Sequence, residues 1–244
     1  MTRPRVAVLV FPGTNSEVET VDACNDAGMD ARAVLWSEAP ASLREFAAYV
    51  LPGGFAYEDR VRAGAIAAKS PSVAVVAEEA QRGKLVLGLC NGAQVVAEAG
   101  LLGPVAIAHN LPAGHFQCRI LDVELSAPPA RCAITAALPA GTRMKMAMAH
   151  GEGRFTADPQ AFDALDREGR VTFRYVGGAP NSALHNAAAV CNDAGNVLAI
   201  MPHPERVAWN YNLAFEEPRL RGLDPMRPSP TALLFAGLAR ALKD

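Results

Sequence analysis

The sequence predicts an α/β fold: a doubly wound, mostly parallel central sheet with flanking helices and antiparallel strands. Short apolar runs suited to buried strands alternate with helical segments over the first hundred residues. Gly-rich or Pro-Gly turns follow several of these runs, where a parallel sheet places its ligand crevice. The chain has 244 residues, 50% of them hydrophobic, so we predict a single domain spanning 1–244.

The first half of the chain alternates strands and helices. Residues 5–11 form the first apolar run, and Ser16-Glu17-Val18-Glu19 has the pattern of a capping box opening a helix that Gly28 closes. Further strands are expected at 31–36, 48–51 and 85–89, a short helical stretch at 42–46, and a helix at 71–82. This order implies right-handed βαβ units.

Beyond Gly103 the segments become shorter and more alternating, which favours antiparallel strands. These are expected at 118–125, 143–149, 171–176 and 187–191, with a helix at 159–168, a buried strand at 197–201 and a last helix at 231–242. The proline-rich segment 209–230 is too long for an idle connection. It is either a partner surface or a tail that wraps around the domain.

Cys90 lies between the apolar run 85–89 and a helical segment at 93–99, with Gly88 and Gly92 two residues on either side. Small residues at these positions allow the strained turn of a nucleophile elbow. The helix N-terminus favours the thiolate form of such a cysteine. Buried packing is the alternative reading, since cysteine is often buried.

A second candidate group follows the strand at 197–201, where Pro202-His203-Pro204-Glu205 carries a base and an acid two residues apart. A thiolate needs an imidazole to manage its proton, and the imidazole needs an orienting carboxylate. Alone, this segment reads as a structural turn. Together with the elbow, it favours a catalytic triad of Cys90, His203 and Glu205.

Composition excludes several classes of function. The net charge of −2 and the pI near 6.2 argue against nucleic acid as a partner, and no apolar run approaches a membrane span. The N-terminus lacks a signal cleavage site, so we expect a cytoplasmic protein. No metal-ligand spacing, phosphate-binding loop or dinucleotide fingerprint occurs, which predicts no metal and no cofactor in this chain. The remaining cysteines, at 24, 118, 132 and 191, are expected to be buried packing residues.

The motifs Gly-Leu-Cys90-Asn-Gly-Ala-Gln94 and Met-Pro-His203-Pro-Glu205-Arg resemble those of class I, or triad, glutamine amidotransferases. The blocks at 11–15, 51–55, 62–67 and 149–155 narrow the resemblance to the glutaminase subunits of phosphoribosylformylglycinamidine synthase, an enzyme of de novo purine synthesis. The resemblance runs from about residue 6 to 209 and implies a flavodoxin-like sheet.

This resemblance implies that Cys90 attacks the side-chain carbonyl of glutamine. The amide of Asn91 and the Gly53-Gly54 loop would stabilise the oxyanion, although Gly53-Gly54 alone could be an ordinary turn. Similarity also assigns residues to a glutamine pocket, the last three largely through their backbone: Gly54, Phe55, Gln94, His150, Gly151 and Glu152. For Gln94, plain solvent exposure is the alternative.

The implied partners are a synthetase subunit that binds ATP with Mg²⁺ and formylglycinamide ribonucleotide, and a small third subunit. Two positions depart from the family pattern: Glu58, where glycine is usual, and the segment 179–182. Two other classes of protein also contain a cysteine elbow. A dienelactone-hydrolase-like enzyme would place its acid before the histidine, whereas a regulatory module with a cysteine elbow would have no use for His203 and Glu205.

Overall fold

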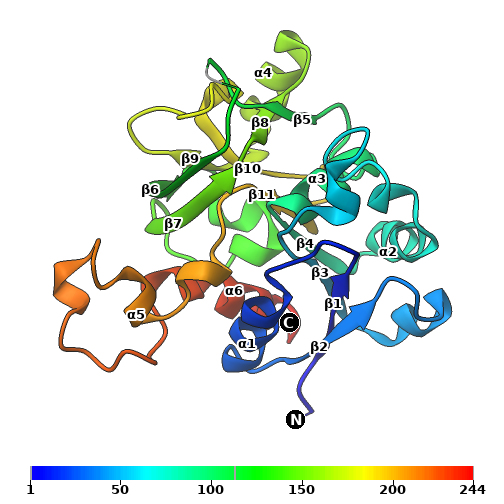
Figure 1. Cartoon of the computed structure of the whole chain (residues 1–244), viewed down its shortest axis with the longest axis horizontal. Coiled ribbons are helices and arrows are strands. Elements are labelled where there is room, and N and C mark those ends of the chain that lie inside the picture. Colours follow the sequence, from blue (N-terminus) through cyan, green and yellow to red (C-terminus); the bar gives the residue numbers. More distant parts are fainter. Residues whose placement is uncertain (1, 113, 244) are drawn as a thin grey trace.

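The computed structural model describes residues 2–112 and 114–243, and its centre is a large mixed sheet (Figure 1). Within these residues the strand order is β2-β1-β3-β4-β11-β10-β9-β6-β7. The parallel half consists of β1 (Arg5–Val10), β2 (Asp30–Leu35), β3 (Ala48–Leu51), β4 (Leu85–Leu89) and β11 (Val197–Ile200). The antiparallel half consists of β10 (Ala187–Cys191), β9 (Val171–Tyr175), β6 (Gln117–Leu125) and β7 (Arg143–His150).

Helices cover both faces of the parallel half. The helices α1 (Glu17–Asp26) and α6 (Leu233–Ala241) pack together on one face, and α2 (Pro71–Gln81) and α3 (Asn91–Glu98) lie on the other (Figure 1). The described residues also contain α4 (Pro159–Arg167), α5 (Asn210–Leu213) and a small sheet of β5 (Ala106–His109) with β8 (Glu152–Thr156). This is the doubly wound architecture that the sequence predicts.

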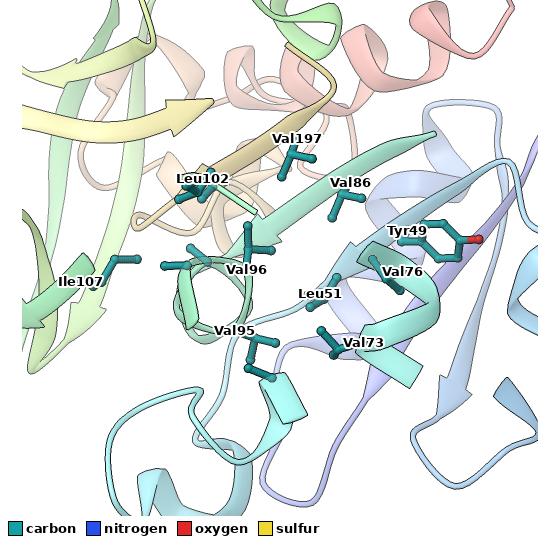
Figure 2. Close-up of a cluster of buried hydrophobic side chains, with 14 of the residues drawn as sticks. Tyr49, Leu51, Val73, Val76, Val86, Val95, Val96, Leu102, Ile107 and Val197 are labelled. Carbon is teal, nitrogen blue, oxygen red and sulfur yellow. The ribbon is translucent and has the colours of Figure 1, made fainter. Parts of the chain in front are cut away.

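The strands are continuously apolar because both of their faces are buried. In β4, Leu85, Leu87 and Leu89 belong to the core beneath α1 and α6, whereas Val86 belongs to the core beneath α2 and α3. Figure 2 shows this second core, in which Val86 and Val197 of the sheet lie beside Val96 of α3. Dense packing on both faces therefore fixes β4 and α3, the two elements that meet at Cys90.

Most of the predicted elements are confirmed within a few residues. The helix predicted at 71–82 is α2, which begins at Pro71 after Ser70 caps it by accepting a hydrogen bond from the Val73 amide at 3.3 Å. The stretch at 42–46 is a 3-10 helix over Pro40–Glu45. The short strands β5 and β8 were not predicted.

Two sequence-based predictions are wrong. The capping box does not form, because the Ser16 hydroxyl makes no cap bond to α1 and instead accepts a hydrogen bond from the Gly53 amide at 2.9 Å. Cys118 is exposed rather than buried. Only residues 123–125 of β6 pair with β9, so the first part of β6 extends beyond the sheet as a ribbon with β7.

The segment 209–230 folds back onto the chain. Trp209 donates its indole N–H to Asp26 of α1 at 2.9 Å, and Ser229 donates its hydroxyl to the carbonyl of Val207 at 2.5 Å. Leu213 and Leu220 pack on Val207. The segment is thus a wrapped tail, and its use as a partner surface stays a prediction. Within the described residues, no helix has both the length and the hydropathy needed to cross a membrane.

Candidate active site

Cys90 occupies the turn between β4 and α3 in a strained conformation, with φ 48° and ψ −104°. The turn closes only with glycine on both sides. A Cβ on Gly92 would lie 1.8 Å from the carbonyl oxygen of Leu51, and one on Gly88 would lie 2.8 Å from the carbonyl oxygen of Gly92. The Cys90 amide donates to Ile200 at 2.8 Å, which ties the turn to β11.

His203 follows β11, the neighbour of β4, and its position is fixed from two sides. Its amide donates to Ala147 of β7 at 2.7 Å, and its ring Nδ1 donates to Oε1 of Glu205 at 2.5 Å. Both side chains are buried. Burial lowers the pKa of His203, but the charges of Glu205 and Cys90 and the hydrogen bonds to both raise it to about 10. The structure therefore brings the three predicted triad residues together.

A cavity of about 250 Å³ opens beside Cys90. Of the predicted site residues, its lining includes Cys90, Gly54, Phe55, Gln94, His150, Gly151 and Glu152. The predicted residues Gly53, Asn91, His203 and Glu205 are not part of the lining. Of these four, Asn91 is hydrogen-bonded through its side chain to the lining residues Asp59 and Gln94.

Gly53 and Gly54 differ in what their amides do. The Gly53 amide donates to Ser16, and the Phe55 amide donates to Gly13 at 2.8 Å. Among the described residues, no hydrogen bond engages the Gly54 amide. The Asn91 amide, at the first position of α3, likewise has no partner within the helix. The amides of Gly54 and Asn91 are thus not engaged by another described residue, whereas the predicted donor Gly53 is engaged by Ser16.

Asn91 and Gln94 connect the elbow to both walls of the cavity. The Asn91 side-chain amide donates to Asp59 at 3.1 Å and to Gln94 at 2.8 Å, and Gln94 donates to the carbonyl oxygen of Glu152 at 2.6 Å. Gln94 is buried, so the alternative of plain solvent exposure is wrong. The backbone carbonyl of Glu152 is thus occupied by Gln94, and its use in binding glutamine stays a prediction.

His150 lies at the end of β7 and lines the cavity. Its Nδ1 lies 3.2 Å from Oδ1 of Asn110, whose amide nitrogen donates to the His150 carbonyl at 2.8 Å. Burial, reinforced by the nearby His203, lowers the pKa of His150 to about 3. The His150 imidazole is therefore neutral near pH 7.

Comparisons with known proteins agree with this geometry. The family model for a CobB/CobQ-like glutamine amidotransferase domain matches residues 3–238. A phosphoribosylformylglycinamidine synthase subunit PurQ from Trichormus variabilis is 39% identical over 234 residues, covering 96% of each chain. One from Methanothrix thermoacetophila is 37% identical over 246 residues, covering 91% of this chain and 94% of its own.

A solved structure, PurLQS from Thermotoga maritima, superimposes with a TM-score of 0.79 at 30% identity, covering 98% of this chain and 99% of that one. The chain belongs to the glutamine amidotransferase family. It is an enzyme of the class I type, as its resemblance to triad amidotransferases predicts.

One loop of this amidotransferase is unusual in its backbone. Tyr57, Glu58, Asp59 and Val61 all have positive φ, between 52° and 71°. Residues other than glycine rarely adopt this conformation. Glu58 therefore stands at a left-handed position, which explains physically why glycine would be the easier residue there.

Several residues of the amidotransferase site were not predicted from sequence: Ser16, Asp59, His109, Asn110 and Phe116. Asp59 lines the cavity, and burial together with Glu152 raises its pKa to about 6, against the hydrogen bond from Asn91. A signal was present for Asp59, because it follows the Gly53-Gly54 loop by only a few residues. His109 ends β5 and Asn110 directly follows it, and this strand is too short to be recognised by its pattern.

Proposed function

We propose that this chain is the glutaminase subunit of a phosphoribosylformylglycinamidine synthase, and that it releases ammonia from glutamine for a synthetase subunit. The curated relatives that carry this subunit's name match the chain over nearly their whole length. The solved relative is a PurLQS structure. The observation that carries the proposal is the elbow cysteine beside a buried His203–Glu205 pair at a cavity of substrate size.

In the first step, His203 takes the proton of the Cys90 thiol and the sulfur adds to the side-chain carbonyl carbon of glutamine. The carbonyl oxygen becomes an oxyanion, and the amides of Asn91 and Gly54 are the donors that would stabilise it. Loss of one such donor costs about 3–4 kcal/mol of barrier in a comparable enzyme.

His203 then donates its proton to the departing nitrogen, which leaves as ammonia while a γ-glutamyl thioester remains on Cys90. In the second step, His203 takes a proton from water, the hydroxyl adds to the thioester carbon, and glutamate leaves with Cys90 restored. The buried Glu205 fixes the ring and stabilises its charge, consistent with the raised pKa of His203.

The synthetase subunit is proposed to bind ATP with Mg²⁺ and to use the ammonia on formylglycinamide ribonucleotide. A small third subunit completes the proposed complex. We place this complex in the cytoplasm, and the free state of all five cysteines supports a reducing compartment.

Substitution of the nucleophile tests the proposal. In the reconstituted complex, Cys90→Ala is expected to abolish glutamine-dependent synthesis, while ammonium chloride still supports synthesis at the wild-type rate. The matched control is Cys118→Ala, at an exposed cysteine outside the cavity, which should keep both activities. If Cys90→Ala also lost ammonium-dependent synthesis, Cys90 would be structural and the proposed role wrong.

A further inference from the structure

The glutamine cavity contains two carboxylates, and within residues 2–112 and 114–243 no lysine or arginine forms an ion pair with either of them. Asp59 and Glu152 both line it. Asp59 lies in residues 57–61, which we call the left-handed loop because four of them have positive φ, and Glu152 lies in β8. Their charges repel each other, since Glu152 contributes to the raised pKa of Asp59. Burial and the repulsion from Glu152 therefore both disfavour the ionised form of Asp59.

The groups that contact these acids leave them unsatisfied. Asp59 accepts a hydrogen bond from the uncharged Asn91 side chain. Glu152 has one oxygen 3.1 Å from Nε2 of His109, and its other oxygen is buried with no partner among the described residues.

The arginines next to Asp59 in the sequence are engaged elsewhere. Arg60 pairs with Glu58 at 2.9 Å, and Arg62 pairs with Glu98 at 2.6 Å. Neither guanidinium is therefore placed to balance the charge of Asp59.

A third group of the cavity is also an unsatisfied acceptor. Asn110 donates through its nitrogen, and its oxygen accepts from the Gly153 amide at 3.2 Å, so the Nδ1 of His150 must donate to that oxygen. The Nε2 of His150 is then a bare acceptor, and it is buried without a partner while the side chain is only 3% exposed.

We propose that Asp59 and Glu152 bind the α-ammonium group of the glutamine substrate and so select the free amino acid. This inference rests on the proposed function, which supplies a ligand that carries an ammonium group three carbons from the carbon that Cys90 attacks. A charge-assisted pair of this kind is short and strong in a partly buried site.

Asn91 connects the proposed α-ammonium site to the catalytic cysteine. Its side chain contacts Asp59, and its backbone amide begins α3 next to Cys90. Asp59 could thus act on the elbow through Asn91 without touching substrate, and the test has to separate these two roles.

The test uses two substrates, L-glutamine and 4-carbamoylbutanoate, which is glutamine without its α-amino group. Ammonia release is measured for both with the full chain in complex with its synthetase. Asp59→Asn is expected to lower kcat/KM for glutamine by about 10- to 100-fold, mostly through KM, as the loss of one charged hydrogen bond predicts. The value for 4-carbamoylbutanoate should stay within about twofold, because that substrate has no ammonium to lose.

Glu58→Gln is the matched control, since it removes the same charge one residue away on an exposed side chain outside the cavity. It should leave both values unchanged. Glu152→Gln is the second variant, and it should lower the same preference for glutamine if Asp59→Asn fails to fold.

Equal losses for both substrates in Asp59→Asn would overturn the proposal and make Asp59 a positioning residue for Asn91. A wild-type complex that uses both substrates equally well would also overturn it, while the proposed glutaminase function would stand. Absence of any glutamine turnover by the wild-type complex would instead refute the proposed function.

Discussion

Gly53 provides a direct test of how the oxyanion loop and the imidazole are packed. A Cβ at this position would lie 2.5 Å from Cε1 and 3.1 Å from Nδ1 of His203. Ordinary contacts begin near 3.4 Å, so in Gly53→Ala the ring must retreat by about 1 Å or the loop must move by as much. His203 is buried and tied to Glu205, so it has little room to comply.

A displacement of about 1 Å in a catalytic group costs on the order of 100-fold in rate. We therefore expect Gly53→Ala to lose about 100-fold in glutaminase kcat, while ammonium-dependent synthesis by the complex is kept. The overpacking should cost about 1–3 kcal/mol of folding free energy, a fall of a few degrees in Tm for a chain of this length. Thermal unfolding would show that the loss of activity is not a loss of fold.

Gly151→Ala is the steric control, at a glycine that lines the cavity. The added Cβ there meets nothing closer than the Phe116 amide at 3.7 Å, so the loss should be at least tenfold smaller, about 10-fold or less. If Gly53→Ala kept its glutaminase rate within about threefold of wild type, the argument from contact with His203 would be refuted.

Two further predictions concern reactivity and regulation. A diazo-ketone analogue of glutamine should label Cys90 and spare the exposed Cys118, which iodoacetamide should modify; burial raises the pKa of Cys24 to about 12 and makes it unreactive to both. Comparable labelling of Cys118 by the analogue, seen in peptide maps, would contradict the assignment of Cys90. The free chain should hydrolyse glutamine poorly and be activated by the synthetase, because raising the competent fraction from about 1% to nearly all takes about 5 kcal/mol of differential binding. Equal steady-state turnover with and without the synthetase would exclude this gating and leave the triad assignment untouched.

Much of the fold could be predicted because its signals are local. The apolar run 85–89, the glycines at 88 and 92 and the Ser70-Pro71 helix start each depend on neighbours in sequence. The same is true of the strand that places His203 beside the elbow.

The supports of the site could not be predicted, because they depend on contacts between distant segments. Ser16 looks like a helix cap, yet its hydroxyl lies 2.9 Å from the amide of Gly53, 37 residues away. A buried donor without a partner costs more than a missing helix cap, which explains why the Gly53 contact prevails. The prediction that Cys118 is buried is wrong because nothing in the neighbouring sequence shows that β6 extends past β9.

The left-handed loop connects the parts of the site that a partner could control. Ala56, which leads into this loop, donates its amide to the Asn91 side chain at 3.0 Å. Asp59 accepts a hydrogen bond from the same side chain at 3.1 Å. A positive φ costs a residue other than glycine about 1 kcal/mol or more, and this loop has four of them in five residues. Such a conformation persists only while its surroundings hold it. Val61, 93% exposed at the end of the loop, is an apolar side chain that a partner could bury. Contact between a partner and Val61 would shift Asp59, Asn91 and the Gly54 amide together. A single movement of the loop would then control both substrate binding and oxyanion stabilisation.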